Sequence, residues 1–206
     1  MFEAFQQNFT PDPDRIPDTA DSLSNIGIPG LAELFARFGG VGFNRGLYRV
    51  IRASDARVWN ARIALGFPKF TNRITCFGYD WLGRVFAADV QRLEQGQPGV
   101  LMFEPGTGKA LVVPANVQTF HDEELARDAD PALAINFHNE WLTNGGAAPA
   151  YAECVGYKTP LFLGGADDFE NIELSDIDVY WHLMGQLIAK TRHLPAGTRI
   201  RRITID

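Results

Sequence analysis

Apolar residues recur at intervals of three and four along several stretches of the chain, which is the spacing of an amphipathic helix. The clearest stretch begins at Ser175, which together with Asp178 matches a capping box. Pro195 ends it, and basic residues precede the proline, where the helix dipole favours positive charge. One broad face of this predicted helix is apolar and carries Val179, Tyr180, Leu183, Met184, Leu187 and Ile188.

The same periodicity predicts helices elsewhere in the chain. They cover residues 2–9, 31–38, 55–65, 117–126 and a segment that begins at Asp130-Pro131 and ends at Asn144-Gly145-Gly146. The last of these carries Leu133, Phe137 and Trp141 at four-residue spacing. Residues 10–21 contain three prolines and four aspartates, and are therefore predicted to be a surface connection.

Short runs rich in valine, leucine and phenylalanine predict β-strands in the middle of the chain. Residues 72–78 and 82–88 pair through a turn at 79–81, and residues 100–103 and 110–113 form a second hairpin. Further short strands are predicted at 47–51, 161–163 and 197–206. Strands flanked by helices indicate an α+β fold, with a curved, mainly antiparallel sheet and helices packed on it.

A weak boundary near residue 68 divides the chain. Residues 1–68 are predicted to be a mainly helical N-terminal region, and residues 69–206 an α+β domain. The chain has 206 residues, of which 46% are hydrophobic, so it is long enough for one domain or for two small ones. We expect the two regions to share one core.

Composition and charge argue against several classes of protein for this chain. A net charge of −6 and a pI near 5.2 argue against a general nucleic-acid binder, since that would need a basic face. Apolar runs stay well short of the roughly 20 residues of a membrane helix, and the N-terminus lacks the pattern of a secretory signal. Cys76 and Cys154 are far apart in the sequence, so we expect buried reduced thiols and a cytoplasmic location.

The sequence does not match the known motifs for catalysis, cofactor binding or metal binding that we compared with it. Gly108-Lys109 invites comparison with a phosphate loop, but Phe103 stands where that loop needs glycine, and Ala110 where it needs serine or threonine. The histidines and cysteines lack metal-ligand spacing. His138 and His182 are predicted on helices, on the polar face or partly packed, and residues 121–124 are predicted to be a solvated helix face. We therefore expect no catalytic residue, no cofactor and no metal.

An acidic run follows the Gly164-Gly165 turn, with no lysine or arginine inside it. Its carboxylates are Asp167, Asp168, Glu170, Glu173, Asp176 and Asp178. The run is interpreted either as a solvated loop with helix-capping acids or as a negative patch that docks a basic partner. The loop pattern of a calcium site is absent. Nearby Tyr157, Tyr180 and Trp181 are of residue types that anchor interfaces.

Several short motifs lie between residues 154 and 187. They are Gly156-Tyr157-Lys158, Pro160-Leu161-Phe162-Leu163-Gly164-Gly165, Asp168, Glu170-Asn171, Asp178-Val179-Tyr180-Trp181 and Gln186-Leu187. Together they resemble the C-terminal region of the bacterial GAD-related, type VI secretion immunity protein family. The resemblance is best over residues 70–195, and it extends to a GAD-like N-terminal region chiefly through residues 38–51. This family is similar in character to the SUKH superfamily of α+β immunity proteins.

The resemblance implies a non-enzymatic protein that binds a cognate toxin effector, a nuclease in this interpretation, and neutralises it by occlusion. Neither nucleic acid nor a membrane is expected as a direct partner. The basic groove of a nuclease would meet the predicted partner-binding residues Asp167, Asp168, Glu170, Glu173 and Asp176. Two alternatives remain open. One is a small-ligand-binding or enzymatic domain with a pocket near the Gly164-Gly165 turn, and the other is an intracellular SUKH-like regulatory scaffold.

Overall fold

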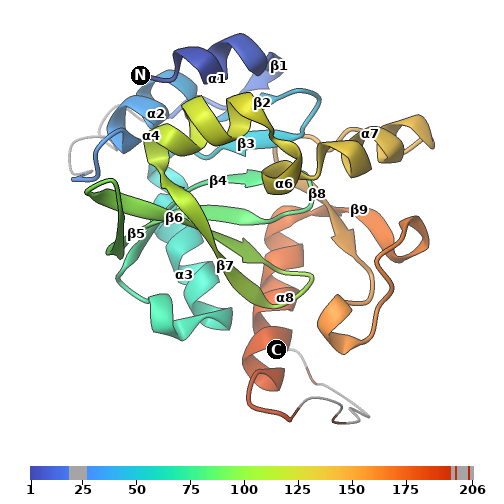
Figure 1. The fold of residues 1–206 in the computed structure, drawn as a ribbon. Coiled ribbons are helices and arrows are strands. Elements are labelled where there is room, and N and C mark those ends of the chain that lie inside the picture. Colours follow the sequence, from blue (N-terminus) through green and yellow to red (C-terminus); the bar gives the residue numbers. More distant parts are fainter. Residues whose placement is uncertain (19–26, 196–197, 199–203, 205–206) are drawn as a thin grey trace.

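The structure is a computed structural model that describes residues 1–18, 27–195, 198 and 204. Its main element is a seven-stranded antiparallel sheet whose strands lie in chain order, β1 to β7 (Figure 1). A two-stranded antiparallel sheet, β8 and β9, lies beside it. Every strand pair is antiparallel, and helices stand before, between and after the strands. This confirms the predicted α+β class.

The strands of the large sheet are joined mostly by short turns, as expected for antiparallel neighbours. They are β1 Pro11–Arg15, β2 Val41–Phe43, β3 Tyr48–Val50, β4 Ile74–Asp80, β5 Val85–Glu94, β6 Gln97–Glu104 and β7 Lys109–Asn116. The small sheet consists of β8 Glu153–Tyr157 and β9 Ile172–Asp176. Both predicted hairpins are confirmed. β5, β6 and β7 are longer than expected, and β4 is shifted by two residues from the predicted 72–78.

Helices account for most of the remaining chain. They are α1 Glu3–Asn8, α2 Leu31–Phe38, α3 Ala56–Gly66, α4 Val117–Thr119, α5 Leu125–Arg127, α6 Asp130–Leu133, α7 Ile135–Thr143 and α8 Ile177–Thr191. A π-helical turn, Phe120–Glu124, joins α4 to α5, and short 3-10 helices lie at Ala53–Asp55, Pro68–Phe70, Leu161–Leu163 and Phe169–Asn171. The predicted helix over 31–38 is confirmed.

Helices cover both faces of the large sheet (Figure 1). On one face, α1, α2 and the helical segment 117–127 enclose a cluster of aromatic rings in mutual contact. Its members are Phe2, Phe5, Phe38, Phe43, Tyr48, Phe77, Phe86 and Phe120. On the other face, α3 packs on β4 and α8, and the rings of Trp59 and Tyr79 lie 5.4 Å apart.

A β-bulge in β4 directs Phe77 into the aromatic cluster. Between Cys76 and Gly78 the register with β5 shifts, so that two residues of β4 span one residue of β5. Gly78 is needed at this position because a Cβ there would lie 2.5 Å from the Tyr48 hydroxyl oxygen. The bulge and the glycine together make room for a polar pair inside the cluster.

That polar pair is Tyr48 and His121, both fully buried. His121 Nε2 lies 3.0 Å from the Tyr48 hydroxyl, and its Nδ1 lies 2.7 Å from the Val117 carbonyl oxygen. Because a carbonyl only accepts, Nδ1 donates, Nε2 accepts from Tyr48, and the ring is neutral. Burial lowers the pKa of His121 to about 4. The predicted solvated face at residues 121–124 was therefore wrong for His121, which the helix turns toward the sheet.

The neighbouring Asp122 holds the N-terminus of the chain. Its carboxylate accepts hydrogen bonds from the backbone N–H of Phe2 at 2.8 Å and of Phe5 at 3.3 Å. The residue before α1 offers no side-chain cap, so a carboxylate 120 positions away satisfies the first helical N–H groups. The aromatic face of α1 is thereby fixed on the core.

The large sheet is continuous across residue 68. β3, before this position, pairs with β4, after it. Buried residues from both sides belong to a single hydrophobic cluster. A division of the chain into regions 1–68 and 69–206 stays a prediction.

Three predicted elements differ in the structure. The connection predicted over residues 10–21 contains β1, an edge strand where prolines are tolerated. The strand predicted at Leu161–Leu163 is a 3-10 helix, closed by a hydrogen bond from the Gly164 N–H to the Leu161 carbonyl oxygen at 3.0 Å. The helix predicted from Asp130 breaks into α6 and α7 at Ala134, whose φ is +51°.

The last helix is correct in existence but begins later than predicted. Asp176, not Ser175, is its N-cap, and the Asp176 carboxylate accepts from the backbone N–H of Asp178 and Val179 at 2.9 Å each. Ser175 belongs to β9, so the predicted capping box was wrong. Val179 is 57% exposed, and the buried face of α8 consists of Ile177, Tyr180, Trp181, Met184, Gly185, Gln186 and Ile188.

The remaining predictions concern the two cysteines, membrane-spanning helices and the C-terminal residues. Cys76 and Cys154 are free and buried, as predicted. In the described part of the chain, none of the helices has both the length and the apolar character needed to cross a bilayer. The edge strand predicted over 197–206 lies outside the described residues, apart from Thr198 and Thr204.

The buried neutral state of His121 predicts a loss of stability in acid. In the unfolded chain its pKa is about 6.5, whereas in the folded protein it is about 4. The unfolded state therefore binds more protons in this window, and the free energy of unfolding falls as pH drops from about 6.5 to about 4. Each unit of pKa difference is worth about 1.4 kcal/mol, so the loss amounts to a few kcal/mol.

Urea unfolding followed at several pH values measures this loss. A His121→Phe variant will be less stable near neutral pH, since Tyr48 and Val117 lose their partner, but its free energy of unfolding will fall less steeply in acid. An unchanged slope in the variant would contradict the assignment to His121.

Candidate functional site

The candidate site is built on the turn between β4 and β5, residues 81–84. Asp80, fully buried at the end of β4, closes this turn. Its Oδ1 accepts from the backbone N–H of Leu82 at 3.1 Å and of Arg84 at 2.8 Å, and its Oδ2 accepts from Arg84 Nε at 2.6 Å. Gly83 has a φ of +72°, which favours glycine at that position.

Residues 130–195, called the C-terminal third below, dock on this turn through three hydrogen bonds. The Trp81 indole donates to the Leu133 carbonyl oxygen at 2.9 Å, and the Trp181 indole donates to the Gly83 carbonyl oxygen at 2.8 Å. The backbone N–H of Val155 in β8 donates to the Trp81 carbonyl oxygen at 2.6 Å. Both indoles are fully buried, so their N–H groups need these partners. The turn thereby joins α6, β8 and α8 to the large sheet.

Arg84 is the charged residue of the turn. Its guanidinium is paired with Asp80, donates to the Ala132 carbonyl oxygen at 3.0 Å, and lies 3.7 Å from Glu104 Oε1. The Arg84 side chain is only 12% exposed. Burial raises the pKa of the Asp80 carboxyl, and the charge of Arg84 opposes that rise. Asp80 is the partner that allows an arginine to be held at this depth.

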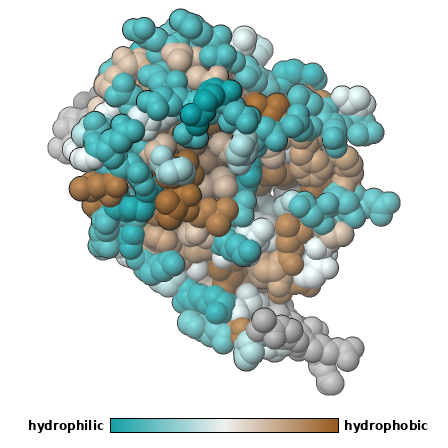
Figure 2. All heavy atoms as spheres, in the orientation of Figure 1, coloured by the Kyte–Doolittle hydropathy of each residue, from teal (hydrophilic) through white to brown (hydrophobic). Residues whose placement is uncertain are grey.

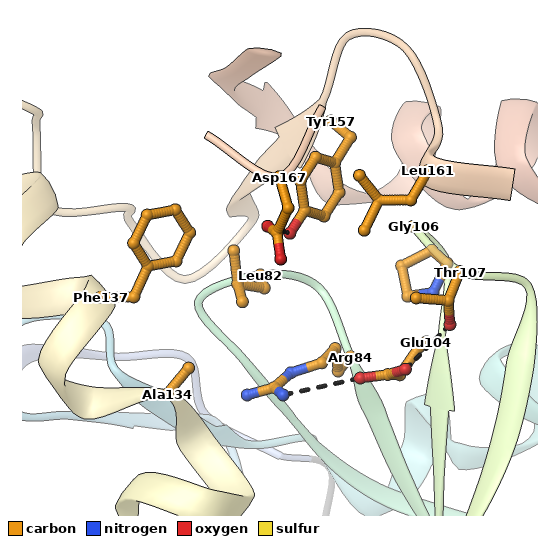
Figure 3. Close-up of a pocket in the computed structure, with 11 residues that line it drawn as sticks. Leu82, Arg84, Glu104, Gly106, Thr107, Ala134, Phe137, Tyr157, Leu161 and Asp167 are labelled. Atoms are coloured by element: carbon orange, nitrogen blue, oxygen red, sulfur yellow. Dashed lines mark hydrogen bonds and ion pairs between the residues drawn. The ribbon is translucent and has the colours of Figure 1, made fainter. Parts of the chain in front are cut away.

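Beyond Arg84 opens a cavity of about 340 Å³. It lies between the large sheet and the C-terminal third of the chain, and it is lined by Leu82, Arg84, Glu104, Pro105, Gly106, Thr107, Ala134, Phe137, Tyr157, Leu161 and Asp167. Figure 3 shows Tyr157 and Asp167 on one side of the cavity and Arg84 and Glu104 on the opposite side. Most of the wall is apolar, and the charged groups occupy its two ends.

Of the five predicted partner-binding acids, Asp167 lines the cavity. It accepts a hydrogen bond from the Tyr157 hydroxyl at 2.6 Å. Burial raises the pKa of Tyr157, and Asp167 raises it further, so the phenol stays protonated and donates. Asp167 is exposed, so its carboxylate is open to both the cavity and solvent.

The other four acids are exposed but have different local roles. Asp168 caps the 3-10 helix Phe169–Asn171 by accepting from the Asn171 N–H at 3.0 Å, and Asp176 caps α8. The carboxylates of Glu170 and Glu173 make no hydrogen bond or ion pair within residues 27–195. The structure therefore separates two capping acids from three whose carboxylates are available to a partner. Assignment of all five to partner binding stays a prediction.

The predicted histidines lie away from this cavity. His138 is buried against Trp81, with ring centroids 5.2 Å apart, and burial lowers its pKa to about 4. It is more deeply packed than predicted. His182 is exposed on α8 and pairs with Gln186. A pocket near the Gly164-Gly165 turn does exist, but no histidine lines it. The described residues contain no group of three or more His, Cys, Asp or Glu suited to holding a metal.

A second surface feature is the edge strand β7. Among the described strands it pairs only with β6, and its Leu111 and Val112 are 38% and 60% exposed. Hydrophobic side chains gather on the face that β7 presents in Figure 2. A second cavity, of about 260 Å³, lies along it. The lining of this cavity is mostly apolar and includes the acids Glu124 and Asp128.

Sequence reasoning missed most of the cavity. Leu82, Arg84 and Glu104 were assigned only to strands or turns, and nothing in their spacing indicates that α7 and the loop after β8 close over them. One signal was present: Asp80 and Arg84 stand on either side of a glycine turn, and such a pair often closes a turn. The cavity itself depends on tertiary packing.

Comparisons with known proteins find a family that the C-terminal segment matches. Residues 115–188 match the family described as T6SS immunity protein Tdi1, C-terminal, which confirms the predicted resemblance to a type VI secretion immunity family over this segment. A comparison with curated proteins finds no match. Among solved structures, the chain is similar to the crystal structure of Atu4351 from Agrobacterium tumefaciens.

That structural similarity extends over almost the whole chain. The TM-score is 0.67 with 14% sequence identity, and the alignment covers 90% of this chain and 89% of that chain. At this identity the similarity shows a shared fold. The segment that matches the family model supplies Ala134, Phe137, Tyr157, Leu161 and Asp167 to the cavity, and the large sheet supplies the opposite side.

The ion pair beneath the cavity predicts a large loss of stability on removal of one partner. An Arg84→Met variant leaves the Asp80 carboxylate buried without a cation, which will cost about 3–5 kcal/mol in the free energy of unfolding. The matched control is Arg127→Met, since Arg127 is 73% exposed in its pair with Glu124, and this change will cost less than about 1 kcal/mol. Urea unfolding of both variants measures the difference, and equal small losses would contradict the account.

Proposed function

We propose that this chain is an immunity protein that binds a cognate toxin effector and neutralises it by covering the toxin's active surface, without turning over a substrate. The observation that carries the proposal is the match of residues 115–188 to the C-terminal region of a type VI secretion immunity protein. This segment includes all five predicted partner-binding acids.

The proposed toxin is a nuclease, and charge supports that choice. A nuclease groove that holds a phosphate backbone is lined by basic side chains. Asp167, Glu170 and Glu173 present carboxylates to solvent on one connected stretch, and the chain as a whole carries a net charge of −6. Complementary charge steers association and fixes orientation. The immunity protein would then compete with nucleic acid for the same basic surface.

The test in cells is co-expression. A candidate toxin encoded beside this gene in the same genome is expressed with and without this protein, and growth and co-purification are scored. The proposal expects restored growth and a complex that survives purification. Growth arrest in the presence of the folded protein, with no complex, would contradict the immunity role.

A charge-reversal variant tests whether the exposed acids Glu170 and Glu173 lie at the rim of the interface with the toxin. Glu170→Lys with Glu173→Lys changes two carboxylates that cap no helix, so folding will be preserved. The association rate constant with the toxin will fall about tenfold at low salt, and its dependence on salt will become weaker. Stopped-flow or surface-binding kinetics measure both.

The matched control is Glu3→Lys with Glu123→Lys, which makes the same charge change on exposed acids of α1 and the turn Phe120–Glu124. If the two double variants slow association equally, only net charge matters, and the assignment of Glu170 and Glu173 to the rim is wrong.

A further inference from the structure

The cavity above Arg84 carries more negative than positive charge. Of the residues that line it, Arg84 contributes one positive charge, and Glu104 and Asp167 contribute one negative charge each. Asp80 already neutralises Arg84 through a hydrogen-bonded ion pair inside the protein. The two remaining carboxylates, Glu104 and Asp167, stand at opposite ends of the cavity (Figure 3).

Among the residues that line the cavity, the two carboxylates share a single cation, Arg84, which is already paired with Asp80. The Glu104 side chain is only 17% exposed, lies 3.7 Å from the already paired Arg84, and accepts from the Thr107 hydroxyl at 2.8 Å. Asp167 accepts from the Tyr157 hydroxyl. A carboxylate that is partly withdrawn from water is stabilised by a positive charge nearby. The cavity is therefore complementary to a cation.

The walls between the carboxylates restrict which cation fits. Leu82, Phe137 and Leu161 offer apolar surface between the two charged ends. A small hydrated ion gains nothing from such walls. An arginine side chain has an apolar stem for them, and its planar guanidinium stacks on aromatic rings and binds carboxylates through paired N–H groups. A volume of about 340 Å³ is ample for one side chain.

We propose that this cavity receives an arginine side chain of the partner, with its guanidinium bonded to Glu104 or Asp167 and its stem packed against Leu82 and Phe137. The inference rests on the proposed function, since it names the group of the toxin that the site recognises. This arginine would anchor the partner in a cavity that is formed by both the family-matched segment, residues 115–188, and the large sheet. The exposed acids Glu170 and Glu173 would steer the encounter, and the buried arginine would slow dissociation.

The direct test uses a small probe. N-acetyl-L-arginine methylamide is titrated into the ¹⁵N-labelled full chain, with the neutral isostere N-acetyl-L-citrulline methylamide as the matched ligand. The arginine compound will shift the backbone amides of Leu82, Gly106 and Asp167 with a dissociation constant on the order of millimolar. The citrulline compound will bind at least tenfold more weakly.

The double variant Glu104→Gln with Asp167→Asn tests the carboxylates, since both new side chains keep hydrogen-bond acceptors for Thr107 and Tyr157. Arginine-selective shifts will disappear, while Glu3→Gln with Glu123→Gln will leave them intact. Equal shifts by the two compounds, shifts outside the cavity, or no shifts with the wild-type chain would overturn the inference.

A protection assay separates the two proposals. If the wild-type chain fails to rescue cells from the toxin while arginine binding persists, the immunity role fails and the arginine site stands. If the wild-type chain protects and the Glu104→Gln, Asp167→Asn variant binds the toxin with an unchanged dissociation rate, the arginine anchor is wrong and the immunity role stands. The expected result is protection by the wild type and dissociation at least tenfold faster in the variant.

Discussion

The structure depends on one buried turn. Asp80 holds the chain between β4 and β5 by accepting from two backbone N–H groups and pairing with Arg84. The turn then presents its own backbone carbonyls to Trp181 and to β8. A buried carboxylate is tolerated only when it is fully paired, so this arrangement either forms completely or is strongly unfavourable. The position of the C-terminal third on the sheet, and hence the cavity, follows from it.

This constraint explains why the candidate site lies at a seam, the boundary between the large sheet and the C-terminal third. The large sheet is a meander whose neighbouring strands are joined mostly by short turns, and its described strands all lie before residue 117. β8, β9 and α8 add a second layer, which contacts the turn through the Trp181 indole and the backbone N–H of Val155 in β8. Polar groups at such a seam are only partly satisfied, as Glu104 and Asp167 show. A cavity in which two carboxylates share one arginine between apolar walls is suited to binding another protein.

Much of the fold could be predicted from sequence because it is locally encoded. Helix 31–38 and the hairpins followed from periodicity and turn residues. The errors arose where tertiary contacts override local preference: Ala134 breaks a helix so that Trp81 can reach the Leu133 carbonyl, and Asp176 rather than Ser175 caps α8 because β9 extends to Asp176. The acidic run was visible in sequence, but Arg84 and Glu104 were not recognisable as its counterpart, since they lie more than sixty residues earlier.

We propose that the partner covers the seam between the large sheet and the C-terminal third. Hydrogen–deuterium exchange of the protein alone and in complex with its toxin tests this most directly. Amides of residues 104–107 and 157–171 will exchange more slowly in the complex, while those of the apolar edge strand β7 will be unchanged. Slower exchange confined to residues 109–116, with residues 157–171 unaffected, would contradict the account.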